Sequence, residues 1–289
     1  MTMKTVAVLG AGTMGRGIAQ VSAAKGNPTR LTDVDEARAR AALADIAAQL
    51  EKLVQKGKLT SDVRHATMSN LSLAPSAATA CDGADVVIEA IVENMAAKAE
   101  LLSGVLPVLS ANALVATNTS SLSITELGGR LGAAERTVGL HFFNPVPVME
   151  LVEVVRGLKT SAETVERALD FAKSLGKTPI VVNDVPGFAT SRLGVILGVE
   201  AMRMVEQGVA SVADIDRGME LGYRHPMGPL KLTDLVGLDV RLAILEHLHR
   251  EVGDQFRPPP LLRQMVRAGK LGKKSGEGFY RWENGQVVG

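Results

Sequence analysis

The feature that most constrains this chain is a glycine-rich turn directly after its first apolar run. Residues 6–9 read Val-Ala-Val-Leu, and the next six are Gly10-Ala11-Gly12-Thr13-Met14-Gly15. In a strand–turn–helix unit, the first glycine permits the tight turn, the second lets the backbone approach an anion, and the third lets the helix pack closely on the strand. The pattern predicts an α/β fold with a phosphate-binding turn. A glycine-rich turn without a ligand is the alternative.

An acidic residue, Asp33, follows 18 residues after Gly15, at the end of the second expected strand. A carboxylate in this position binds a ribose hydroxyl of a dinucleotide and repels a 2′-phosphate. NAD is therefore favoured over NADP, although Arg30 and Arg38 could offset the charge. FAD uses the same turn, but the chain has no further flavin signal. The expected NAD site comprises Gly10, Gly12, Met14, Gly15 and Asp33.

The first 183 residues alternate short apolar runs with amphipathic or alanine-rich segments. We expect strands at 6–9, 29–31, 85–92, 113–117, 137–142, 150–155 and 179–182. A nearly continuous apolar run such as 86–92 is typical of a strand covered by helices on both faces. This alternation predicts a doubly wound, mostly parallel Rossmann sheet. One helical stretch, 38–58, is longer than a simple crossover requires.

The character of the chain changes at 183–187, Asn-Asp-Val-Pro-Gly. Beyond it the pattern is helical, at 188–207, 211–221, 235–252 and 261–268, before a glycine- and lysine-rich tail at 272–280. We therefore expect two domains. Residues 1–184 form an NAD-binding Rossmann domain with a helical insertion, and 185–289 form an all-helical domain.

Composition excludes several classes of function. Among 289 residues the formal net charge is +1, there is no run of Lys or Arg, and only 3% are aromatic, which argues against nucleic acid or a membrane surface as partner. No stretch reaches the roughly 18 apolar residues of a membrane span. The single cysteine, Cys81, excludes an internal disulfide, and we expect no metal site. With no cleavage signal near residue 1, we expect a cytoplasmic protein.

A proline-containing reversal between two extended runs contains the clearest candidate for catalysis. If the reversal centres on Pro147, His141 and Glu153 each lie six residues away and face each other. A carboxylate bound to one imidazole nitrogen fixes the tautomer and makes the other nitrogen a better base. Glu150 is a rival partner, but its odd offset from Glu153 places it on the other face of a strand. A histidine that serves only in packing is the alternative.

The polar segment 117–121, Thr-Asn-Thr-Ser-Ser, ends a strand at the carboxyl edge of the sheet. Open α/β sheets bind ligands at this edge. Its hydroxyl groups, including that of Ser120, could bind nicotinamide or a substrate alcohol. They could equally cap a helix that begins near residue 124.

At this point the sequence resembles the short-chain L-3-hydroxyacyl-CoA dehydrogenases, which include the bacterial 3-hydroxybutyryl-CoA dehydrogenases. The resemblance covers essentially the whole chain and has several long motifs in the family's order. They are 10–17 with Asp33, 88–94 with Lys98, 118–121, 141–153, 184–188, 226–229 and 272–280.

The resemblance implies reversible oxidation of an (S)-3-hydroxyacyl-CoA to the 3-ketoacyl-CoA with NAD, within fatty-acid or butanoate metabolism. It assigns His141 as general acid/base, Glu153 as its orienting partner, and Ser120 to the reacting hydroxyl and the nicotinamide. Further cofactor contacts are Glu93, Lys98, Asn144 and Lys274, and Lys56 meets a CoA phosphate, with Ser120 and Asn144 also at the substrate. The helical domain would pair two subunits in a homodimer.

One position departs from the family pattern. Members commonly carry Asn after Pro-Gly-Phe-x-x, where this chain has Ser191. A hydroxyl is shorter and donates one hydrogen bond, so the contact with the substrate carbonyl would be weaker or water-mediated. Loss of such a donor costs on the order of 10²- to 10³-fold in rate.

Two other functions remain as alternatives at this point. A dehydrogenase of a free hydroxy acid typically uses a lysine base, which the His141–Glu153 pair opposes. A non-catalytic, crystallin-like NAD-binding protein is opposed by intact Ser120, His141 and Glu153.

Overall fold

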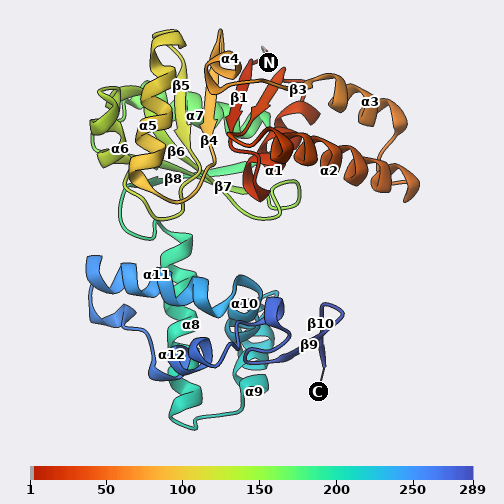
Figure 1. Ribbon diagram of the computed structural model, residues 1–289. Coiled ribbons are helices and arrows are strands. Elements are labelled where there is room, and N and C mark those ends of the chain that lie inside the picture. Colours follow the sequence, from red (N-terminus) through yellow and green to blue (C-terminus); the bar gives the residue numbers. More distant parts are fainter. Residues whose placement is uncertain (1–2, 289) are drawn as a thin grey trace. The chain divides into compact units, whose positions relative to one another are not determined.

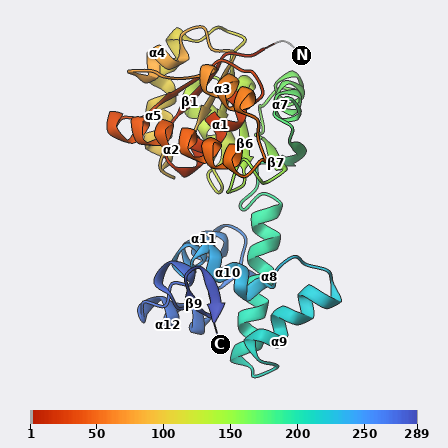
Figure 2. The same cartoon turned by 90° about the vertical axis from the view of Figure 1, so that its right-hand side faces the viewer.

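The computed structural model describes residues 3–288, and its contacts divide the chain into two compact units, Met1–Val185 and Pro186–Gly289 (Figures 1 and 2). The first unit is built on a sheet and the second on helices.

The sheet of the first unit has eight strands in the order β3-β2-β1-β4-β5-β6-β7-β8. All neighbours are parallel except β6 and β7, which are antiparallel. The strands are β1 (Val6–Leu9), β2 (Thr29–Thr32), β3 (Leu71–Leu73), β4 (Val86–Glu89), β5 (Leu114–Thr117), β6 (Thr137–Phe142), β7 (Leu151–Arg156) and β8 (Thr178–Asn183).

Helices cover both faces of this sheet. They are α1 (Thr13–Ala24), α2 (Glu36–Gln55), α3 (Ser61–Ser69), α4 (Ala77–Cys81), α5 (Met95–Val105), α6 (Ile124–Leu131) and α7 (Ala162–Ser174), with 3₁₀ turns at Leu106–Val108 and Ala134–Arg136. One buried apolar cluster joins the sheet to α1, α2 and α7, and a second joins it to α4, α5 and α6. Because β4 is buried on both faces, its side chains are nearly all apolar.

Three local expectations differ from the structure. The long helical stretch expected at 38–58 is α2, and a separate helix, α3, follows it. Strand β3 was not predicted, because three residues are too few to show a period of two. Strand β4 ends at Glu89 rather than at residue 92, since the Glu89 carboxylate accepts a hydrogen bond from the Ile91 amide at 2.6 Å and the chain turns there.

The second unit is mainly helical. It contains α8 (Thr190–Glu206), α9 (Val212–Arg217) with a π turn (Gly218–Gly222), α10 (Pro229–Val236), α11 (Leu238–Glu251), α12 (Pro260–Arg267) and 3₁₀ turns at Asp254–Phe256 and Lys273–Ser275. The helix expected at 235–252 is interrupted by Gly237, whose φ of +102° is not helical. The fold class is confirmed, but the unit is not entirely helical: a short antiparallel hairpin of β9 (Arg281–Glu283) and β10 (Gln286–Val288) ends it.

A buried carboxylate anchors the glycine-rich tail of this unit. Asp234, 1% exposed, accepts hydrogen bonds from the amides of Phe279 and Tyr280 and from the indole N–H of Trp282, each at 2.9 Å. Burial raises the pKa of Asp234, although these bonds oppose the shift. A Cβ on Gly278 would lie 2.2 Å from the same carboxylate, so glycine is required there.

None of the helices within residues 3–288 has the length and apolar character needed to cross a bilayer.

Candidate active site

The glycine turn between β1 and α1 has the shape that a dinucleotide requires. Gly10 has φ +107°, and a Cβ there would lie 2.6 Å from the carbonyl oxygen of Ala90. A Cβ on Gly15 would lie 1.8 Å from the carbonyl oxygen of Gly10, whereas one on Gly12 would meet nothing within 4 Å. Gly12 is the N-cap of α1 and offers no side-chain cap. The first amides of α1 therefore suit an anion.

Asp33 is held beside this turn, at the end of β2. Its Oδ2 accepts a hydrogen bond from the Ala11 amide at 2.8 Å, and its Oδ1 accepts one from the Asp35 amide at 3.0 Å. Arg30 is engaged elsewhere, with the carbonyl oxygen of Asp82 at 2.5 Å, whereas Arg38 lies 4.0 Å from Asp33. The residues present thus fit the adenosine half of NAD. Met14 lies in the first turn of α1, partly buried against the core.

Glu93 organises the polar segment after β5. Its Oε1 accepts hydrogen bonds from the Thr119 hydroxyl at 2.5 Å, the Ser120 amide at 3.0 Å and the Ser121 amide at 3.2 Å. Partial burial would raise the pKa of Glu93, but these bonds and the Lys98 ammonium outweigh it and lower the pKa below its ordinary 4.5. Glu93 is therefore a carboxylate that fixes the position of Ser120, which is itself exposed.

Behind Glu93 lies a buried ion pair. Lys98, 1% exposed, places its Nζ 2.8 Å from Glu89 Oε1 and 3.3 Å from Glu93 Oε2. Glu89 is fully buried and also accepts the Thr117 hydroxyl at 2.6 Å. Sequence reasoning did not single out Glu89. The sequence pattern that could have identified it is a glutamate at the end of an apolar strand, followed by a lysine on the next helix.

His141 and Glu153 are direct partners in the antiparallel register of β6 and β7. The imidazole Nδ1 and the carboxylate Oε2 are 2.7 Å apart, and the two residues are 7% and 0% exposed. The rival acid, Glu150, precedes β7 and is exposed. The Phe143 ring centroid lies 4.5 Å from that of the imidazole. The reversal therefore places His141 and Glu153 face to face.

The carboxyl ends of neighbouring strands bring these parts to one edge. The glycine turn follows β1, Asp33 follows β2, Glu89 ends β4, and Ser120 follows β5. The Asn118 side-chain oxygen accepts the Phe142 amide at 2.9 Å, which ties the segment after β5 to the strand of His141.

The remaining predicted residues lie apart from this network. Asn144 is exposed on the loop after β6, joined to Pro145 by a cis peptide bond, and Lys56 is exposed as the C-cap of α2. Ser191 and Lys274 belong to the second unit. Ser191 is in the first turn of α8, and the Lys274 ammonium bonds Asp239 Oδ2 at 2.6 Å.

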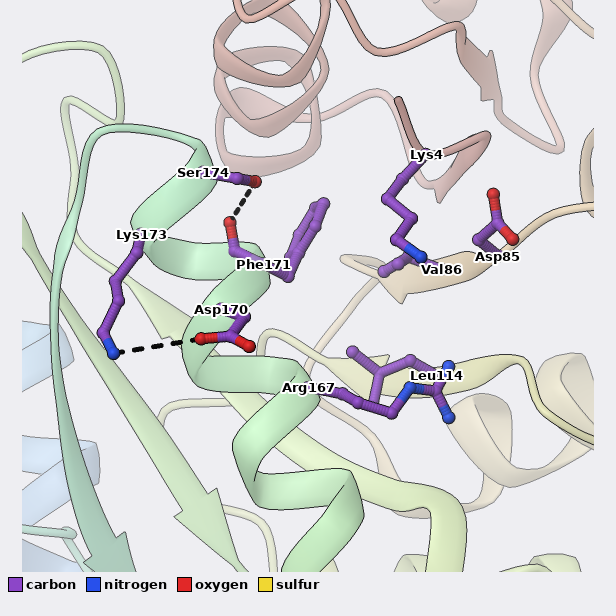
Figure 3. Close-up of a pocket in the computed structure, with 9 residues that line it drawn as sticks. All are labelled: Lys4, Asp85, Val86, Leu114, Arg167, Asp170, Phe171, Lys173 and Ser174. Atoms are coloured by element: carbon purple, nitrogen blue, oxygen red, sulfur yellow. Dashed lines mark hydrogen bonds and ion pairs between the residues drawn. The ribbon is translucent and has the colours of Figure 1, made fainter. Parts of the chain in front are cut away.

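A cavity of about 490 Å³ in the first unit lies away from the predicted site residues (Figure 3). It is at the amino ends of β1, β4 and β5, beside the second half of α7, and is lined by Lys4, Asp85, Val86, Leu114, Arg167, Asp170, Phe171, Lys173 and Ser174. None of the predicted site residues lines it. No group of three or more metal-binding side chains occurs in the part of the chain described here.

Two family models together match nearly all of the chain. The 3-hydroxyacyl-CoA dehydrogenase NAD binding domain matches residues 5–185, and the C-terminal domain of the same family matches residues 187–282.

Similar proteins agree with these matches. A probable 3-hydroxybutyryl-CoA dehydrogenase of Bacillus subtilis is 46% identical, over 98% of this chain and 99% of its own. The mitochondrial hydroxyacyl-coenzyme A dehydrogenase of Sus scrofa is 42% identical, over 97% and 92%. The crystal structure of (S)-3-hydroxybutyryl-CoA dehydrogenase from Ralstonia eutropha has a TM-score of 0.93 at 41% identity, over 98% and 100%. The chain therefore belongs to the 3-hydroxyacyl-CoA dehydrogenase family and carries its NAD-binding domain.

Proposed function

We propose that this protein catalyses the reversible, NAD-dependent oxidation of an (S)-3-hydroxyacyl-CoA, such as 3-hydroxybutyryl-CoA, to the 3-ketoacyl-CoA. The observation that carries the proposal is the buried His141–Glu153 pair, with Nδ1 and Oε2 2.7 Å apart, in a chain of this family. A buried imidazole with a carboxylate on one nitrogen suits proton exchange with a substrate hydroxyl.

His141 and Glu153 have different roles in the proposed proton transfer. Since Glu153 engages Nδ1, His141 exchanges its proton with the substrate at Nε2. In the oxidative direction the imidazole accepts the hydroxyl proton, and the Glu153 carboxylate stabilises the imidazolium that results. In the reductive direction the same nitrogen returns the proton to the forming alcohol. Bound NAD would supply the hydride acceptor for the oxidation, and bound NADH the hydride donor for the reduction.

Two groups of residues at the carboxyl edge of the sheet would hold the cofactor. Gly10, Gly12 and Gly15, with the amides of α1, would receive the pyrophosphate, and Asp33 would receive a ribose hydroxyl. Glu93, supported by Lys98, holds the Ser120 amide at the carboxyl edge, where the Ser120 hydroxyl would meet the reacting groups. Met14, Asn144, Lys274 and Ser191 are proposed as further cofactor or substrate contacts, and Lys56 as a contact of the CoA phosphate.

A comparison of substrates and cofactors tests the proposal. NADH oxidation is measured with acetoacetyl-CoA, with free acetoacetate, and with NADPH in place of NADH. We expect turnover that requires both the CoA thioester and NADH. Turnover of the free acid would indicate a hydroxy-acid dehydrogenase instead. Tight NADH binding without turnover of any acyl-CoA would indicate a non-catalytic protein.

We also propose that the protein is a cytoplasmic homodimer formed through its second unit. On α8, Leu193 and Leu197 are one turn apart and 65% and 41% exposed, and Leu221 is 72% exposed. Such apolar side chains suit an interface between subunits. Sedimentation equilibrium should give twice 30.4 kDa, and a single-chain mass would contradict the dimer. Cell fractionation tests the compartment.

A further inference from the structure

Lys177 is a buried lysine to which the mechanism above gives no role. It lies in the turn between α7 and β8 and is 9% exposed. Its Nζ donates hydrogen bonds to the carbonyl oxygens of Val146 at 2.6 Å and Met149 at 2.7 Å. Both carbonyls belong to residues 143–150, the β6–β7 loop, which joins the strand of His141 to the strand of Glu153. Lys177 thus fastens this loop by two charge-assisted hydrogen bonds.

The surroundings of Lys177 do not favour a cation. Burial is the largest cause that lowers the pKa of its ammonium, and Lys25 lowers it further, while Glu150 opposes the shift. A Cβ on the neighbouring Gly176 would lie 3.2 Å from the Lys25 ammonium, so that charge is close. An ammonium in such a place is retained at a cost that its hydrogen bonds must offset. An apolar side chain would fill the same space without this desolvation cost. The two hydrogen bonds to carbonyl oxygens are therefore what distinguishes a lysine at this position.

The β6–β7 loop that Lys177 holds also packs on the cofactor-binding helix. Val146 is 2% exposed, and a Cβ on Gly17 of α1 would lie 2.8 Å from the Val146 Cβ. Gly17 is one turn from the start of α1, where the dinucleotide turn ends. Lys177 and α1 therefore both contact the loop at Val146.

We propose that Lys177 is a positioning residue for hydride transfer. Through the β6–β7 loop it keeps His141 and Asn144 in a fixed place relative to α1 and the dinucleotide turn. The inference rests on the proposed function, because it assumes that His141 and Asn144 face the reacting groups. Lys177 itself touches neither substrate nor cofactor. A displacement of about 1 Å caused from a distance can cost on the order of 10²-fold in rate.

The test compares Lys177→Met, Lys177→Arg and, as a matched control, Lys173→Met, which removes an exposed lysine four residues away. Each variant is assayed with acetoacetyl-CoA and NADH, and again with NADH deuterated at the transferred position. Active sites are counted by NADH binding, and folding is followed by circular dichroism. Val146→Ala loosens the contact of the same loop with α1, so it tests the proposal independently if Lys177→Met does not fold. Wild type and His141→Ala accompany every assay.

For Lys177→Met we expect kcat per active site to fall about 10- to 100-fold, with less than about a threefold change in the Kd of NADH. The deuterium isotope effect on kcat should rise, because hydride transfer becomes the slow step. Lys177→Arg, which retains a buried cation, should recover part of the rate. Val146→Ala should show the same rise in isotope effect, and Lys173→Met should match wild type.

The proposal is overturned if folded Lys177→Met, or Val146→Ala in its place, keeps the wild-type kcat and isotope effect. It is equally overturned if the lost activity equals the lost NADH-binding sites, because a merely structural residue would act in that way. Failure of the underlying function looks different: wild type and His141→Ala would then turn over equally, or neither would turn over.

Discussion

The two edges of the central sheet are made of the same strands but differ in what their side chains do. At the carboxyl edge, Asp33, Glu89, Glu93 and Glu153 each accept hydrogen bonds from other elements, and together they fix the glycine turn, Ser120 and His141. At the amino edge, the side chain of Asp85 accepts only the Thr5 amide, at 2.8 Å, among the bonds described.

The cavity of about 490 Å³ is at the amino edge (Figure 3), whereas the proposed active site is at the carboxyl edge. The difference follows from the topology. In β-α units the chain leaves the carboxyl end of a strand and begins a helix, so loops, helix amides and polar side chains gather there. Side chains that line the cavity at the amino edge bond to other residues of the chain. Lys173 and Asp170, for example, form an ion pair with Nζ and Oδ1 3.9 Å apart. The convergence of polar groups, rather than the volume of a cavity, is therefore the basis on which we propose the active site.

Among the substitutions that leave His141 in place, the largest effect is expected from Glu153→Gln. The amide keeps the size of the side chain but removes the charge that we propose stabilises the imidazolium. We expect kcat to fall on the order of 10²-fold with less than about a threefold change in the Kd of NADH. Steady-state kinetics and NADH fluorescence titration measure the two quantities. Equal loss of NADH binding in folded protein would place Glu153 outside the acid–base chemistry.

Asp33→Ala tests the other end of the carboxyl edge. Removing the carboxylate removes its repulsion of a 2′-phosphate, while Arg38 remains nearby at 4.0 Å in the native structure. The ratio of kcat/KM for NADH to that for NADPH should fall about tenfold, which corresponds to about 1.4 kcal/mol. An unchanged ratio would remove Asp33 from cofactor discrimination. Arg30→Ala serves as the control, since Arg30 bonds the carbonyl of Asp82.

A smaller effect, on stability, is expected from Glu93→Gln. Because the folded state lowers the pKa of Glu93, the carboxylate contributes stability above its ordinary pKa of 4.5. That contribution is lost as the pH falls from about 4.5 through the folded-state pKa. Wild type should therefore exceed Glu93→Gln in Tm at pH 7, and the gap should narrow below pH 4.5. A gap independent of pH would mean that the charge of Glu93 is not what stabilises the loop.

The smallest effect is expected at the amino edge. Arg167→Met removes a hydrogen bond to the carbonyl oxygen of Asn112 and changes the lining of the cavity. We expect kcat and both KM values to stay within about twofold, and stability to change by about 0.5 kcal/mol. A tenfold loss of kcat would show that the cavity takes part in function, and the contrast between the edges would fail.

Some of this site was predictable from sequence, and some was not. The glycine turn, Asp33 and the facing of His141 and Glu153 depend on short-range rules of turn and strand geometry, so spacing along the chain was sufficient. Glu89 and Lys177 were not singled out, because their partners come from other elements: Thr117 and Lys98 for the first, and the carbonyls of Val146 and Met149 for the second. A lysine that bonds backbone carbonyls has no signature in the residues it binds.

The fold was also predictable in part, where the pattern of apolar residues was long enough to show a period. The order of strands and helices in the first unit was readable from alternating apolar runs, whereas β3 and the hairpin of β9 and β10 were too short to show a period. The break at Gly237 was missed because the apolar spacing continues across it.

The most direct test of the central claim is a single-turnover measurement on wild type and His141→Ala. Enzyme with bound NADH is mixed rapidly with acetoacetyl-CoA, and the hydride-transfer rate is followed by NADH fluorescence. If His141 is the general acid, the alanine variant should transfer hydride on the order of 10²- to 10⁴-fold more slowly while its Kd for NADH stays within about threefold of wild type. Equal single-turnover rates in the two proteins would contradict the account.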